Sequence, residues 1–162
     1  FLVLNHLPHT QIMDTIASLL SGIGTAGIIW FILACILFFR EEKKSHWFFA
    51  PVLCAGIASL VSDFFLKPLI GRMRPTDALG LTDYSFPSGH ATIAFAMVVV
   101  LSRYEPRWRV SLYVLAVLIS FSRIYLGVHY PMDVIAGAVV GIIIGWFSLM
   151  LGSFGRPKSI RN

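Results

Sequence analysis

Three ionisable side chains lie close together between two long apolar runs of the sequence. Arg123, His129 and Asp133 fall within eleven residues, and apolar residues dominate on both sides of them. A charged side chain at the centre of a membrane helix costs roughly 2.5 to 3.5 kcal/mol on insertion scales, so such groups rarely face lipid. The three residues therefore predict a polar cavity that has a function.

Two more cations precede a polar stretch earlier in the chain. Lys67 and Arg74 are seven positions apart, and Arg123 supplies a third fixed positive charge. Such a cluster favours an anion of more than one charge. Phosphate fits best, because arginine donates two hydrogen bonds to its oxygens and lysine adds a point charge.

The segment Pro87-Ser88-Gly89-His90 opens another apolar run. Ser88 is a favoured residue for capping the start of a helix, and the positive end of that helix would attract an anion. Gly89 would let an oxyanion approach the backbone closely. We therefore expect Ser88 and Gly89 to bind the same phosphate as the three cations.

The two histidines suggest phosphoryl transfer, which needs an in-line nucleophile and a proton for the leaving oxygen. Asp133 follows His129 by four residues, a spacing that suits a nucleophile held by an orienting carboxylate. His90, from another segment, would then be the general acid. A two-metal site would need more carboxylates than Asp133 and the loop residues Asp77 and Asp83, so we expect a phosphohistidine and no metal or cofactor.

The composition indicates which elements must position these residues. The chain has 162 residues, of which 57% are hydrophobic and 13% charged, and its mean hydropathy is +0.79. These values are typical of a polytopic membrane protein, and the length suits a single domain, residues 1–162, with the motifs within 67–133. Because helices satisfy their own backbone in lipid, we predict an all-α transmembrane helical bundle.

Five membrane spans are expected, at residues 22–39, 47–66, 91–101, 110–126 and 131–152. The third is shorter than the others, even when extended back to Ser88. Before the first span, residues 12–20 carry apolar side chains at helical spacing. We expect an amphipathic helix in the membrane interface there, with a pore-lining helix as the alternative.

Some residues around the motifs are expected to support them. Asp63 precedes Lys67 by four residues and would form an ion pair that positions the lysine. Pro75 directly follows Arg74, and Tyr125 lies near the site. Arg72 is expected to be a membrane-surface anchor instead. Two G-x-x-x-G steps in the last span are expected to pack helices within the bundle, and their residues are Gly137, Gly141 and Gly145.

The net charge of +5 reflects topology and not nucleic-acid binding. If the spans alternate, loops 40–46 and 103–109 share one side with the C-terminus, and that side holds nine of the thirteen basic residues. The positive-inside rule makes it the cytoplasmic side. The proposed site is then extracytoplasmic. The expected partners are the bilayer and a lipid phosphate substrate, and we expect no obligate protein partner.

Together, the three segments resemble the complete signature of the type-2 phosphatidic acid phosphatase superfamily, with no departure at a key position. The matching segments are Lys67-x6-Arg74-Pro75, Pro87-Ser88-Gly89-His90 and Ser122-Arg123-x5-His129-x3-Asp133. The resemblance implies that His129 attacks phosphorus with Asp133 behind it, and that His90 protonates the leaving group. It also implies a set of phosphate ligands: Lys67, Arg74, Ser88, Gly89 and Arg123. The membrane members usually have six spans, so either the N-terminal segment is the sixth helix or a first helix is missing.

The resemblance implies an integral-membrane lipid phosphatase or diphosphatase. Undecaprenyl diphosphate is slightly favoured because the chain is compact; phosphatidylglycerophosphate, phosphatidic acid and a lipid A phosphate are the other candidates. Two other classes stay open. A non-enzymatic anion transporter or channel would need charge along a path through the bundle, and the spans away from the site lack ionisable residues. A vanadium-dependent haloperoxidase would share the signature, but those enzymes are soluble and this chain has membrane spans.

Overall fold

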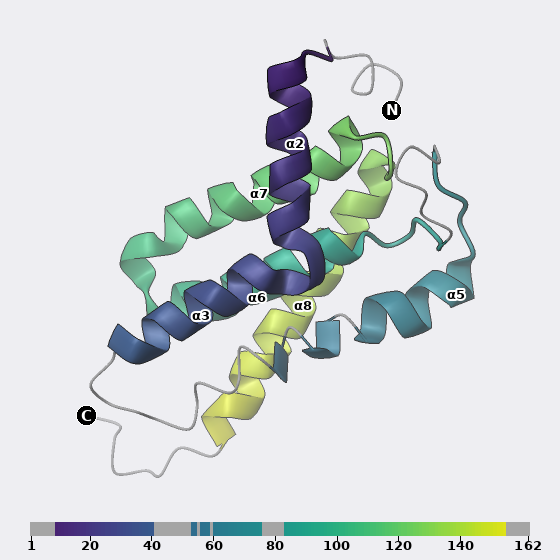
Figure 1. Cartoon of the computed structure of the whole chain (residues 1–162). Helices are drawn as coiled ribbons and strands as arrows, with labels where there is room; N and C mark the ends of the chain where they lie inside the picture. Colours follow the sequence, from purple (N-terminus) through teal and green to yellow (C-terminus); the bar gives the residue numbers. More distant parts are fainter. Residues whose placement is uncertain (1–8, 41–52, 55, 59, 76–82, 155–162) are drawn as a thin grey trace.

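The computed structural model describes residues 9–40, 53–54, 56–58, 60–75 and 83–154 (Figure 1). Within these residues the chain is helical and contains no strand, which confirms the predicted all-α class. The elements are α2 (Gln11–Gly24), the 3₁₀ turn η1 (Thr25–Gly27), α3 (Ile28–Arg40), the π-helix η3 (Leu60–Leu66), α5 (Lys67–Ile70), α6 (Gly89–Tyr104), the 3₁₀ turn η4 (Pro106–Trp108), α7 (Arg109–Tyr125) and α8 (Pro131–Phe154).

Helix α6 lies at the centre of the described bundle, between α3, α7 and α8 (Figure 1). Eleven of its sixteen residues are buried. At 1.5 Å per residue such a helix is about 24 Å long, shorter than the ~30 Å of a hydrocarbon core. The helix at the position of the predicted third span is therefore shorter than a hydrocarbon core is thick, and its neighbours enclose it.

Glycines on α8 allow it to approach α6 closely. A Cβ atom at Gly141 would lie 2.3 Å from the carbonyl oxygen of Thr92, and one at Gly137 would lie 2.6 Å from that of Ser88. Gly145 makes the same kind of approach one turn later. The two G-x-x-x-G steps thus allow α8 to pack closely against α6 inside the bundle, as the sequence predicted.

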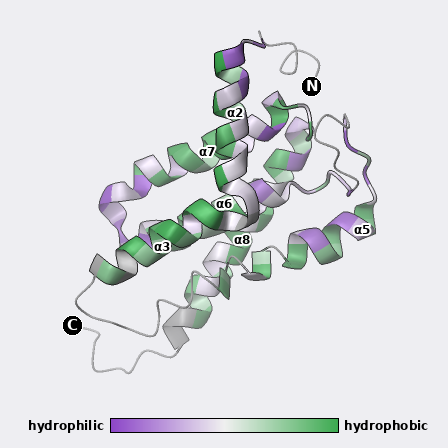
Figure 2. Cartoon of the chain, viewed as in Figure 1, coloured by the Kyte–Doolittle hydropathy of each residue, from purple (hydrophilic) through white to green (hydrophobic). Residues whose placement is uncertain are grey.

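Helices α7 and α8 expose many large apolar side chains, and hydrophobic residues occur along both helices (Figure 2). Their exposed side chains recur at helical spacing and include Val110, Val114, Val117, Ile135, Val139 and Ile142. Residues Pro106–Tyr125 and Pro131–Leu151 are each long and apolar enough to cross a membrane, and α2 with α3 would form a third, bent span. The protein is therefore embedded in a membrane. The span expected at 47–66 lies partly outside the described residues.

The N-terminal region departs from the sequence prediction. We expected an amphipathic helix over residues 12–20 and a membrane span over residues 22–39. Instead α2 continues to Gly24, and the chain then bends by 65° into α3. Gly27 has a φ of 73°, a conformation that glycine adopts without a steric penalty, so the turn can form there. Helix α2 packs against α7 and belongs to the bundle.

Candidate active site

The end of α7 sets the spacing between Arg123 and His129. Gly127 has a φ of 70°. The N–H of Val128 donates to the carbonyl oxygen of Arg123 at 3.2 Å, and the N–H of Gly127 donates to that of Ile124 at 3.0 Å. These are the two hydrogen bonds of a Schellman cap, which reverses the chain after a helix. The five residues between Arg123 and His129 therefore form the cap at the end of α7.

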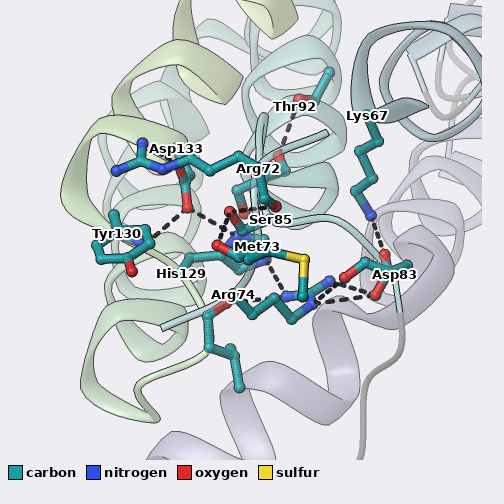
Figure 3. A network of polar contacts seen from close by, with 12 residues as sticks. Lys67, Arg72, Met73, Arg74, Asp83, Ser85, Thr92, His129, Tyr130 and Asp133 are labelled. Carbon is teal, nitrogen blue, oxygen red and sulfur yellow. Dashed lines mark hydrogen bonds and ion pairs between the residues drawn. The ribbon is translucent and has the colours of Figure 1, made fainter. Parts of the chain in front are cut away.

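Asp133 is fully buried in the first turn of α8 and has three partners. Its Oδ2 accepts a hydrogen bond from the N–H of Tyr130 at 2.8 Å, which caps the helix. The same oxygen lies 3.6 Å from Nδ1 of His129, slightly beyond hydrogen-bond distance. Its Oδ1 accepts a hydrogen bond from Nη1 of Arg72 at 2.8 Å (Figure 3). One carboxylate thus both caps α8 and lies behind the histidine.

His129 is buried, and its Nε2 lies 3.2 Å from Nη1 of Arg74, which also donates to the carbonyl oxygen of Val128 at 3.0 Å. A guanidinium nitrogen can only donate, so Nε2 must be the acceptor and Nδ1 must carry the proton, on the side of Asp133. Burial is the largest influence on the pKa of His129 and lowers it; Asp133 opposes this effect, whereas Arg74 and Arg123 add to it. The ring therefore presents an unprotonated Nε2, as a nucleophile requires.

Lys67 and Arg74 converge on one carboxylate, that of Asp83 (Figure 3). Nζ of Lys67 lies 2.6 Å from Oδ2, and Nη2 of Arg74 lies 2.6 Å from Oδ1. Burial alone would raise the pKa of Asp83, but the hydrogen bonds from Lys67 and Arg74 outweigh it and hold the pKa below its usual range. Lys67 also forms the expected ion pair with Asp63, at 2.8 Å. The two cations are therefore arranged to bind a single anion.

The segment between the two cations is held by contacts that the sequence did not predict. The N–H and hydroxyl of Ser85 bond to the carbonyl oxygens of Arg72 and Met73, at 2.8 and 3.1 Å respectively. Arg72 also stacks 4.1 Å from the ring centre of Tyr130. The interpretation of Arg72 as a membrane-surface anchor was wrong, because its guanidinium pairs with the buried Asp133.

Ser88 occupies the N-cap position of α6, but its side chain does not form the expected capping hydrogen bond. Its backbone N–H instead donates to the carbonyl oxygen of Asp133 at 3.0 Å. The hydroxyl is buried without a partner among the described residues, and the same holds for Nε of Arg123. Buried donors are nearly always bonded, and Arg123 lines the cavity described below, so its Nε suits a polar ligand bound there.

A cavity of about 540 Å³ brings the three segments together. Six expected site residues line it, with Asp83 beside them: Lys67, Arg74, Gly89, His90, Arg123 and His129; the supporting residue Asp63 lines it as well. Of the remaining expected residues, Ser88 and Asp133 lie adjacent to the lining through the contacts described above. Pro75 and Tyr125 do not line the cavity, and the Tyr125 hydroxyl donates instead to Asp14 of α2 at 2.8 Å. The described residues contain no group of three or more His, Cys, Asp or Glu side chains placed to hold a metal ion.

Comparison with known proteins gives consistent findings. The sequence pattern of the PAP2 superfamily matches residues 47–154. An undecaprenyl-diphosphatase from Sulfolobus acidocaldarius is 33% identical over 83% of this chain and 68% of its own length. A lipid A 4'-phosphatase from Bacteroides thetaiotaomicron is 32% identical over 75% of this chain and 64% of its own length. The crystal structure of a transmembrane PAP2-type phosphatidylglycerolphosphate phosphatase from Bacillus subtilis has the same fold, with a TM-score of 0.77 over 93% of this chain and 81% of that chain, at 23% identity.

Proposed function

Because this chain belongs to the PAP2 superfamily and is a hydrolase of phosphate esters, we propose that it removes the terminal phosphate from undecaprenyl diphosphate in the membrane. One observation carries the proposal: Lys67 and Arg74 bind the same carboxylate next to the unprotonated Nε2 of His129. A phosphate in that position would be held by both cations and placed beside a nucleophile.

In the proposed reaction the substrate phosphate replaces the carboxylate of Asp83 on Lys67 and Arg74. A phosphate carries more negative charge than a carboxylate and has further oxygens for Nε of Arg123 and the hydroxyl of Ser88. The exchange therefore gives partners to two buried donors that have none among the described residues.

Nε2 of His129 then attacks phosphorus, and the bond from phosphorus to the leaving oxygen breaks. His90 donates a proton to that oxygen, and the lipid monophosphate leaves. Asp133 stabilises the positive charge that develops on the His129 ring. Neutral His90 next takes a proton from water, and the water oxygen attacks the phosphohistidine. The P–N bond breaks, which releases inorganic phosphate and regenerates neutral His129 and protonated His90. No step in this scheme requires a metal ion.

Several features support a lipid substrate on the extracytoplasmic side. Apolar helix faces surround the bundle, so a long hydrocarbon tail can stay in the bilayer while its headgroup reaches the cavity. The basic residues gather in loops 40–46 and 103–109 and in the C-terminal tail, which favours the opposite side for the site. The relative from Sulfolobus acidocaldarius favours undecaprenyl diphosphate among the candidates.

A panel of lipid phosphates tests the proposal directly. We expect the purified protein in detergent to release phosphate fastest from undecaprenyl diphosphate, ahead of phosphatidylglycerophosphate, phosphatidic acid and lipid A. EDTA should leave the rate unchanged, because histidine and the three cations supply the nucleophile and the charge. Faster release from another lipid would reassign the headgroup, and release from none would refute the phosphatase. Loss of activity in EDTA would show that the reaction needs a metal.

The pH profile tests the role of His129. The nucleophile must be neutral, and burial with the nearby arginines lowers the pKa of His129 below the usual value of about 6.5. Protonation, which stops the attack, therefore requires a lower pH than for a free histidine. We expect kcat/KM to persist below pH 6.5 and to fall only as the pH drops through that lowered pKa. An acid limb centred above pH 6.5 would contradict this assignment.

A further inference from the structure

Ser21 of α2 contacts two residues of the proposed site at once. Its hydroxyl accepts a hydrogen bond from Nη1 of Arg123, and its carbonyl oxygen lies 3.2 Å from Nε2 of His90. The residue is 6% exposed. It lies outside the three signature segments and outside residues 47–154, which the PAP2 superfamily pattern matches.

The hydroxyl of Ser21 fixes one end of the Arg123 guanidinium. A guanidinium has no acceptor, so the serine oxygen must accept this hydrogen bond. Arg123 lines the cavity, and its Nε has no partner among the described residues. Holding Nη1 from the α2 side sets the plane of the guanidinium and leaves Nε for the phosphate.

The carbonyl oxygen of Ser21 sets which nitrogen of His90 transfers a proton. A carbonyl oxygen can only accept, so Nε2 must carry a hydrogen. When His90 is protonated, the proton on Nδ1 is therefore the one that can pass to the leaving oxygen. After this transfer the neutral ring keeps the hydrogen bond from Nε2 to the carbonyl oxygen of Ser21. The hydroxyl of Thr25 also donates to this carbonyl oxygen, at 3.0 Å, and lies 3.5 Å from the same Nε2.

Contacts near both ends of α2 fix the position of this helix. Near its start, Asp14 accepts a hydrogen bond from the hydroxyl of Tyr125 at 2.8 Å. Near its end, Gly24 lines the cavity, and a Cβ there would lie 3.2 Å from the His90 ring and 2.7 Å from Ile119. These contacts leave little freedom for the helix to shift relative to α7.

We propose that Ser21 is a positioning residue of the active site, which orients Arg123 for phosphate and His90 for proton transfer. This inference rests on the proposed function. It makes α2 one wall of the site, although all the signature residues come from other elements.

The test replaces Ser21 by alanine and measures inhibition by vanadate, an anion that mimics the five-coordinate phosphorus formed during phosphoryl transfer. Losing the hydroxyl removes a hydrogen bond from a charged donor, so we expect the inhibition constant and KM to rise about tenfold. Because Ser21 is buried, losing its hydroxyl should also lower the thermal unfolding midpoint by a few degrees, so inhibition is measured at a temperature where the variant is fully folded. Ser21→Thr keeps a hydroxyl and should restore vanadate binding.

The matched control is Ser18→Ala, one turn earlier on the same helix, where the side chain is exposed. It should bind vanadate like the wild type. If Ser21→Ala equals the wild type in vanadate inhibition and kcat/KM, or if Ser21→Thr fails to rescue, the inference is overturned and the proposed function stands. If the wild-type protein releases no phosphate from any lipid in the panel, the proposed function fails first and the inference fails with it.

Discussion

Replacing His129 by alanine is expected to lower kcat by at least ~10⁴-fold without unfolding the protein. The substitution removes the nitrogen that would bond to phosphorus, and the neighbouring Asp133 cannot take its place because Arg72 and the N–H of Tyr130 hold its carboxylate. Phosphate release from the preferred lipid measures the loss. Gel filtration in detergent should show the wild-type elution volume.

His9 provides a matched control for this experiment. It is a histidine on the exposed N-terminal side of α2 and does not line the cavity. His9→Ala should retain activity close to that of the wild type. A lipid phosphate with a radioactive terminal phosphate should label the wild type and leave His129→Ala unlabelled. If His129→Ala keeps activity within tenfold of the wild type, the nucleophile is another group and the reaction scheme is wrong.

Residues of all three motifs line one cavity, and each motif coincides with a helix end. The Arg123–His129 spacing is a Schellman cap, and Asp133 is a capping acid in the first turn of the next helix. Helix ends bring residues distant in the chain to one face of a bundle. Their spacing can therefore be interpreted without knowing which helices are neighbours.

The contacts that the sequence did not predict join residues far apart in the chain. Arg72 and Asp133 are 61 positions apart, and Ser21 and Arg123 are 102 apart. Residue periodicity indicates which face of a helix is apolar, but it does not indicate which side chain on another element will meet that face. The roles of Arg72 and Asp83 depend on the path of the segment that carries them, which no local pattern encodes.

The packing of helix α2 against α7 was not predicted for a related reason. Its polar residues suggested a helix in the membrane interface, and its large apolar side chains are indeed exposed. The signal that would have placed it in the bundle is a stripe of small residues, Ala17, Ser21 and Gly24, all buried against its neighbours. Small residues at helical spacing allow close helix contact in membranes, as they do on α8.

Replacing Gly141 by leucine is expected to prevent the protein from folding stably. A Cβ at this position would lie 2.3 Å from the carbonyl oxygen and 2.9 Å from the amide nitrogen of residues on α6, Thr92 and Ala96. Backbone atoms cannot rotate out of the way, so the two helices must separate. Adding atoms to a packed interior costs typically 1–3 kcal/mol, and more where the backbone must move, against a total stability of about 5–15 kcal/mol. Thermal unfolding in detergent measures the loss.

Gly22→Leu is the matched control, because a Cβ at Gly22 of α2 meets no atom within 4 Å. Leucine favours a helix over glycine by up to about 1 kcal/mol, so this variant should be as stable as the wild type or slightly more stable. Comparing Gly141→Leu with His129→Ala distinguishes a residue needed for folding from a residue needed only for catalysis. His129→Ala should lose activity in a folded protein, whereas Gly141→Leu should lose both together, because Ser88, Gly89 and His90 start the helix that it displaces. A folded and active Gly141→Leu would mean that α6 and α8 do not pack at this distance, and the position assigned to Ser88 against Asp133 would fail with it.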